Sequence, residues 1–133
     1  MKRLEHIGIA VKNLEEANRL FARLLGKPHY KIEVVESEGV RTSFFDVGNV
    51  KIELLEATRE DSPIARFIEK KGEGLHHLAF EVEHIQQHIT AAAENQFALL
   101  NTAPKPGADN KMIAFLHPKT TGGVLVEMCE DKK

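Results

Sequence analysis

The chain has 133 residues with a single cysteine, no tryptophan and no long apolar run. Cys129 has no cysteine partner within the chain, which is typical of proteins from reducing compartments. No apolar stretch approaches the roughly 18 residues that a membrane-spanning helix needs, and the N-terminus lacks the apolar segment of a secretory signal. These absences predict a soluble, cytoplasmic protein with no membrane partner.

An excess of charge of one sign is also missing. The formal net charge is -2, although 29% of the residues are charged. Binding to nucleic acid by counterion release depends on a basic surface, so no nucleic-acid partner is expected. The hydrophobic content of 42% is enough for the core of one ordinary domain, and we predict a single domain over residues 1–133.

The sequence contains an internal repeat. Residues 4–15 (LEHIGIAVKNLE) match residues 75–86 (LHHLAFEVEHIQ) position for position, and His6 falls on His77. In both copies the apolar residues alternate as in a strand with one buried face. The two histidines lie on the opposite face of their strands.

Each copy continues with one helix and three more extended segments, so each half is predicted to be a β-α-β-β-β module. The expected later strands are KIEVVE, TSFFDV and KIELLE in the first half, and FALL, MIAFL and VLVEM in the second. The modules span about residues 1–60 and 74–133. Ser62 followed by Pro63 predicts the start of a linking helix over about 62–72. The predicted fold class is α+β, with two pseudo-symmetric modules.

The last strands of the two halves also match, and Glu53 falls on Glu127. Their apolar neighbours should face the helices, which places both carboxylates on the same face as His6 and His77. Any one of these residues alone would more often be structural or solvated. All four together, paired by the repeat, favour a divalent metal site with open positions for substrate.

Other polar residues give weaker indications. His76 alternates with His77 and is expected on the helix-facing side in a structural role. Lys119 lies in the polar turn HPKTTGG, where a lysine near a carboxylate-bearing site is suited to steer an anionic substrate. The chain has no nucleophile elbow, no phosphate-binding glycine loop and no paired-cysteine motif.

The paired modules with HIGIAV, KIELLE, GLHHLAFEV and GGVLVE resemble the vicinal oxygen chelate (glyoxalase/bleomycin resistance) superfamily. Two longer segments, DSPIARFIEKKGEGLHHLAFEV and FLHPKTTGGVLVE, are similar more narrowly to the methylmalonyl-CoA epimerase family. The resemblance implies an eight-stranded cup around a metal site. It also implies that His6, Glu53, His77 and Glu127 are the metal ligands, the second being glutamine in some members.

The resemblance further implies an isomerase that interconverts (2R)- and (2S)-methylmalonyl-CoA by α-proton abstraction and enolate stabilisation. Its substrate would be an acyl-CoA thioester and its assembly a homodimer. The expected metal is Co²⁺ first, with Mn²⁺, Ni²⁺ or Zn²⁺ as alternatives.

One position departs from part of the family. Some epimerases carry a glutamate, proposed as one of the two bases, where this chain has Thr42. A threonine is no general base at neutral pH, so Glu53 and Glu127 become the expected catalytic pair.

Three other functions share the predicted fold or part of the predicted ligand set. Glyoxalase I (lactoylglutathione lyase) has bacterial members with the same four ligands, so only the two longer segments favour the epimerase. An extradiol dioxygenase would use two histidines and one carboxylate around iron, but those enzymes are usually longer. A non-catalytic bleomycin-type binding protein should lack the complete ligand set.

Overall fold

The computed structural model describes residues 1–133. Its elements, in chain order, are β1 (Arg3–Ala10), α1 (Leu14–Leu25), β2 (Lys31–Val35), the 3₁₀ helix η1 (Glu36–Glu38), β3 (Val40–Val47), β4 (Val50–Ala57), α2 (Pro63–Lys71), β5 (Gly74–Glu81), α3 (Ile85–Glu94), β6 (Lys105–Pro106), β7 (Lys111–Leu116), the 3₁₀ helix η2 (Pro118–Thr120) and β8 (Val126–Asp131). The order β-α-β-β-β occurs twice, and the α+β class is confirmed. None of the helices combines the length and the apolar character that crossing a bilayer requires.

The chain divides into two compact units. One, here the N-terminal unit, is His6–His76; the other, the C-terminal unit, consists of Met1–Glu5 and His77–Lys133. The linking helix α2 belongs to the N-terminal unit. The prediction of one domain with modules at about 1–60 and 74–133 stays a prediction.

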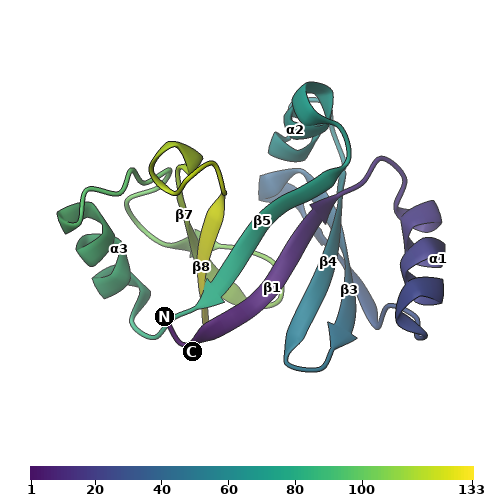
Figure 1. The fold of residues 1–133 in the computed structure, drawn as a ribbon, viewed down its shortest axis with the longest axis horizontal. Helices are drawn as coiled ribbons and strands as arrows, with labels where there is room; N and C mark the ends of the chain where they lie inside the picture. Colours follow the sequence, from purple (N-terminus) through teal and green to yellow (C-terminus); the bar gives the residue numbers. More distant parts are fainter. The chain divides into compact units, whose positions relative to one another are not determined.

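In the N-terminal unit the strands lie in the order β2-β3-β4-β1. β2, β3 and β4 are antiparallel neighbours. β1 runs parallel to β4, as Figure 1 shows. Gly8 of β1 lies beside Glu53 of β4 in the register. Directly paired residues point to the same face of a sheet, and residues two apart in a strand do so as well. His6 and Glu53 therefore share one face, as the alternation predicted.

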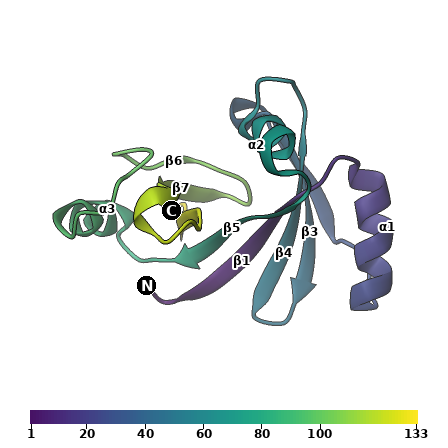
Figure 2. The same ribbon diagram turned by 45° about the horizontal axis from the view of Figure 1, so that its top comes forward.

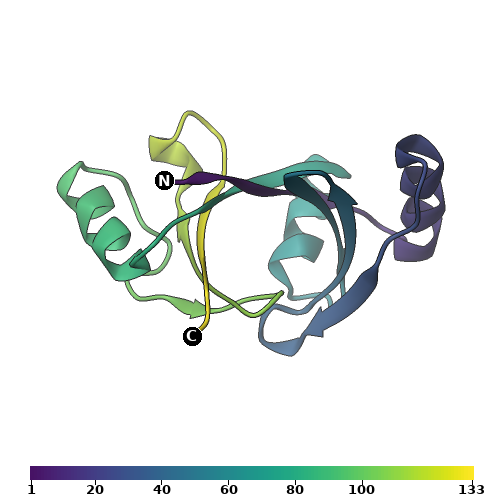
Figure 3. The same ribbon diagram turned by 90° about the horizontal axis from the view of Figure 1, so that it is seen from below.

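Helices α1 and α2 cover opposite faces of this sheet (Figure 3). On the α1 side the buried residues are Val11, Leu14, Ala17, Phe45 and Leu54. On the α2 side they are Ala10, Val40, Leu55 and Ile64. Leu54 and Leu55 are consecutive, so the strand alternation sends one into each layer. On the face that carries Glu53, α2 thus packs at the end where Leu55 lies.

The start of α1 is fastened to the sheet by Glu56. Its carboxylate accepts the N–H of Leu14 at 2.9 Å and a hydrogen bond from Arg41 Nε at 3.1 Å. Arg41 also donates to Glu15 at 2.8 Å; this bond lowers the pKa of Glu15 and raises that of Arg41. The pair therefore stabilises the fold above the ordinary pKa of glutamate, and its contribution is lost as the pH falls through the lowered pKa of Glu15.

The C-terminal unit repeats this plan, with strand order β5-β8-β7-β6 and with β5 parallel to β8. Helix α3 packs against β7 and β8, and Figure 2 shows it on the side of β7. The buried apolar residues of this layer are Val82, Ile85, Ile89, Ala114, Leu116 and Met128. Glu130 caps α3 as Glu56 caps α1: its carboxylate accepts the N–H groups of His84 at 2.6 Å and Ile85 at 3.2 Å.

The prediction of a strand at FALL (97–100) is wrong. Only Leu99 forms an isolated bridge, to Leu116, and the strand at this edge is the short β6. The ladder stops because the side-chain oxygen of Asn101 accepts the N–H of Phe115 at 2.9 Å. A continuing strand would have supplied a backbone carbonyl for that donor.

The linking helix is confirmed at its predicted boundaries. The hydroxyl oxygen of Ser62 accepts the N–H of Ala65, Pro63 occupies the first turn and Gly72 ends the helix. Ser62 is fully buried and packs close to Gly39. A Cβ atom at Gly39 would lie 2.8 Å from the Cβ of Ser62, so the close approach depends on glycine there.

Gly39→Ala should destabilise the protein more than Gly48→Ala. Both glycines have positive φ, at 63° and 78°, and each substitution should cost about 1 kcal/mol of unfolding free energy for that reason. At Gly48 a Cβ meets nothing within 4 Å, so only the Gly39 variant adds a clash, worth about 1–3 kcal/mol. Urea unfolding of both variants measures the difference, and equal losses would contradict the packing described.

Candidate functional site

The first half of the site is a buried histidine–glutamate pair in the N-terminal unit. His6 Nδ1 lies 3.1 Å from Glu53 Oε2, and each residue is only 4% exposed. The two come from the parallel neighbours β1 and β4. Gly8, next to Glu53 in the register, has no side chain, so this strand position leaves space beside the carboxylate.

The second half is the corresponding pair in the C-terminal unit. His77 Nε2 lies 3.2 Å from Glu127 Oε1, with the residues 7% and 5% exposed. Here the parallel neighbours are β5 and β8, and the small residue beside Glu127 in the register is Ala79. The ring of Phe115 stands edge-on to His77, with 6.0 Å between ring centroids. Each predicted histidine thus meets the predicted glutamate of its own repeat.

Phenylalanine occupies equivalent positions beside the two carboxylates. Phe44 of β3 is the direct cross-strand partner of Glu53, and Phe115 of β7 is that of Glu127. The two halves therefore share a histidine, a glutamate and a flanking aromatic ring. They differ in the ring nitrogen that contacts the carboxylate, which is Nδ1 in His6 and Nε2 in His77.

The atoms of each pair suit a divalent metal ion. Neutral imidazole nitrogen and carboxylate oxygen are common ligands of Zn²⁺, Co²⁺, Mn²⁺ and Ni²⁺. Bonds of about 2.1 Å place neighbouring ligand atoms about 3 Å apart, close to the 3.1 Å and 3.2 Å measured within the pairs. His77 and Glu127 also belong to a cluster of buried side chains whose ligand atoms lie close enough together to hold a metal ion. The donor set thus fits a metal ion.

His76 has a different environment from His77. Its ring stands edge-on to Phe67 of α2, with 4.9 Å between centroids and 80° between ring planes. Alternation along β5 sends consecutive side chains to opposite faces. His76 therefore packs between β5 and the linking helix α2, and its predicted place on the side of the helix of its own repeat stays a prediction.

Lys119 lies on η2 and is exposed. Its backbone N–H donates to Nδ1 of His117 at 3.0 Å, which fixes the turn that presents the lysine side chain. A substrate-binding role of Lys119 stays a prediction.

Thr42 is 1% exposed and lies on the face that carries the glutamate of the N-terminal pair. Its cross-strand partner is Leu55, and Phe44, two residues later on β3, is the partner of Glu53. The position where some epimerases carry a glutamate base thus holds the neutral hydroxyl group of Thr42.

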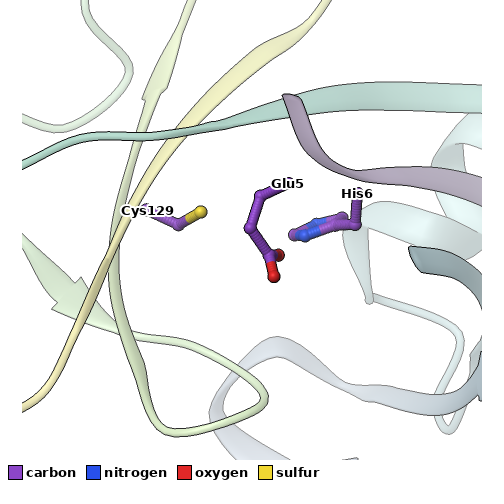
Figure 4. A group of neighbouring side chains, drawn as sticks. All are labelled: Glu5, His6 and Cys129. Atoms are coloured by element: carbon purple, nitrogen blue, oxygen red, sulfur yellow. The ribbon is translucent and has the colours of Figure 1, made fainter. Parts of the chain in front are cut away.

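Two buried charged residues in the C-terminal unit were not found by sequence reasoning. Glu5 and Lys111 are 3% and 7% exposed, and Lys111 Nζ lies 3.9 Å from Glu5 Oε2 while forming an ion pair with Asp131. The thiol of Cys129, which is fully buried, points toward the Glu5 side chain (Figure 4). The available signal was a charged residue two positions before an apolar strand residue, Ile7 for Glu5 and Ile113 for Lys111.

Residues 5–115 match the model of the glyoxalase/bleomycin resistance protein/dioxygenase superfamily. Among similar proteins, YqjC of Bacillus subtilis is 43% identical over 132 residues, covering 99% of this chain and 94% of the relative. Human mitochondrial methylmalonyl-CoA epimerase is 39% identical over 127 residues, covering 95% of this chain and 72% of the relative.

A solved structure extends the likeness to the fold. A variant of methylmalonyl-CoA epimerase from Streptomyces coelicolor, in complex with 2-nitronate-propionyl-CoA, superposes with a TM-score of 0.94. The two sequences are 32% identical, and the alignment covers 98% of this chain and 95% of that one.

His77→Ala should abolish stoichiometric binding of a divalent metal, whereas His76→Ala should retain it. The first substitution removes a donor beside Glu127; the second removes a ring packed on α2. Metal content by elemental analysis of the purified variants measures the effect, with circular dichroism as a folding control. Equal metal content in the two variants would overturn the face assignment.

Proposed function

We propose, because the chain belongs to the methylmalonyl-CoA epimerase family of the glyoxalase/bleomycin resistance protein/dioxygenase superfamily, that it interconverts the 2R and 2S forms of methylmalonyl-CoA. The observation that carries the proposal is the presence of two equivalent buried histidine–glutamate pairs, one in each repeat. An epimerase must remove a proton on one side of a carbon and return one on the other, and two equivalent carboxylates suit that task.

We propose His6, Glu53, His77 and Glu127 as the ligands of a divalent metal ion, with Co²⁺ as the first candidate and Mn²⁺, Ni²⁺ or Zn²⁺ as alternatives. Support comes from the donor types, from their burial and from their pairing by the internal repeat. When bound, such an ion acts as a Lewis acid toward the thioester carbonyl and the carboxylate of the substrate.

The chain's own part in the reaction is proton transfer. In the proposed mechanism one of Glu53 and Glu127 accepts the α-proton, and the other delivers a proton to the opposite side of the carbon. Thr42 has no acid–base function at neutral pH, which leaves the two glutamates as the candidates. His6 Nδ1 lies 3.1 Å from Glu53, and His77 Nε2 lies 3.2 Å from Glu127, so each carboxylate has a fixed neighbour within its own unit.

Three further features belong to the same proposal. Lys119, exposed on its turn, attracts the anionic substrate. The assembly is a homodimer, which rests on the family likeness. The compartment is the cytoplasm, which rests on the single cysteine and on the composition of the chain.

The purified protein, loaded with Co²⁺, should exchange the α-hydrogen of methylmalonyl-CoA with deuterium from the solvent. Exchange is the direct product of proton removal and return, and mass spectrometry or proton NMR detects it. A mixture of methylglyoxal and glutathione serves as the comparison substrate. No exchange, together with turnover of that mixture, would replace the epimerase with a glyoxalase.

Glu53→Gln and Glu127→Gln should each lower the epimerisation rate by about 10²–10⁴-fold, because each removes one acid–base group. Each variant should still exchange the α-proton of one stereoisomer, and the two variants should prefer opposite stereoisomers. Deuterium exchange with separately prepared 2R and 2S substrates measures this. If both variants retain exchange with the same stereoisomer, the division of roles between the two carboxylates is wrong.

A further inference from the structure

Two lysines converge on the phenylalanine that borders the N-terminal pair. Lys31 Nζ lies 4.6 Å from the centroid of the Phe44 ring, and Lys51 Nζ lies 5.9 Å from it. Phe44 itself is fully buried, while both lysines are half-buried. An ammonium group over an aromatic face is held by the negative charge of the ring surface. The ammonium groups of both lysines therefore lie close to the Phe44 ring.

The strand register places these charges on the site face. Lys31 pairs with Phe44 across β2 and β3, and Phe44 pairs with Glu53 across β3 and β4. Lys51 lies beside His6 in the parallel pairing of β1 and β4. Paired residues share a face, so both lysines point to the side that carries the histidine and the glutamate.

Each lysine has an acidic residue nearby on the strands. Lys31 Nζ lies 3.8 Å from Glu33, and Lys51 is the cross-strand partner of the exposed Asp46. An ion pair as exposed as that of Lys31 with Glu33 contributes little energy, and an ammonium group can donate to more than one acceptor. The lysines are therefore suited to bind an additional anionic group.

We propose that Lys31 and Lys51 bind the carboxylate of the acyl group and so select acyl-CoA thioesters that carry a second carboxylate; this rests on the proposed function. Neighbouring strands are about 4.8 Å apart, so the Cα of Lys31 lies only about 10 Å from that of Glu53. That separation fits the short acyl group. The phosphates of coenzyme A lie beyond the long pantetheine arm and are a poorer fit.

The lysines also have a consequence for the reaction. Proton loss beside a carboxylate places a second negative charge next to the first, and nearby cations reduce the cost of this accumulation. A carboxylate has two oxygens, so it accepts hydrogen bonds from an ammonium group on one while the other meets a different partner. The lysines thus act on a substrate group that a simple acyl-CoA lacks.

Methylmalonyl-CoA and propionyl-CoA form a matched pair of ligands, because they differ by that carboxylate alone. Calorimetric titration of the metal-loaded protein should show tighter binding of methylmalonyl-CoA. Lys51→Met and Lys31→Met should each weaken its binding by about tenfold, as expected for loss of a charged hydrogen bond, and should leave propionyl-CoA within about twofold. Lys27→Met, which removes an exposed lysine of the same unit, is the control and should change neither.

Equal weakening of both ligands by Lys51→Met and Lys31→Met would overturn the proposal, as would no weakening. A methylmalonyl thioester of pantetheine, which lacks the nucleotide, adds a second criterion. In the two lysine variants its affinity should fall as much as that of methylmalonyl-CoA. A loss of affinity seen only with the full coenzyme would mean that the lysines bind the phosphates instead. Because epimerisation only interconverts the two forms of the ligand, the titration reports the binding of their equilibrium mixture. Failure of the proposed epimerase activity appears separately, in the deuterium exchange of the unmodified protein.

Discussion

A carboxylate that is almost completely buried must have a partner, and this constraint shapes both repeats. Removing an ionised carboxylate from water costs several kcal/mol unless hydrogen bonds and opposite charge offset the loss. In both units an imidazole from the first strand meets the glutamate of the last strand. The first and last strands of each module must therefore be neighbours. The parallel pairings β1–β4 and β5–β8 satisfy that requirement.

Much of this arrangement could be predicted because the two halves of the sequence repeat the same pattern. The repeat identified His6 with His77 and Glu53 with Glu127, and strand alternation placed each pair on the face away from α1 or α3. The resemblance to the methylmalonyl-CoA epimerase family is confirmed by relatives that align with nearly the whole chain. Local signals at Ser62 and Pro63 also gave the start of α2 correctly, because capping depends on a few adjacent residues.

Other features depend on contacts distant in sequence and could not be predicted in this way. The segment 97–100 has the composition of a strand, but the side chain of Asn101 takes the donor that a strand would need. The burial of Glu5 and Lys111 similarly depends on which charged groups three-dimensional packing brings together. Alternation describes which face a residue occupies, but it does not tell how deeply that face is covered.

Each last strand carries a second glutamate three residues after the first, and the two point to opposite faces. Glu53 meets a histidine while Glu56 holds the start of α1, and Glu127 and Glu130 divide the same tasks in the other unit. A shift of one residue in strand pairing exchanges the two faces. It would bury a charge against the apolar helix layer and uncap the helix at once. The strand register of each repeat is thus fixed at two points, by the buried histidine–glutamate pair on one face and by the helix cap on the other.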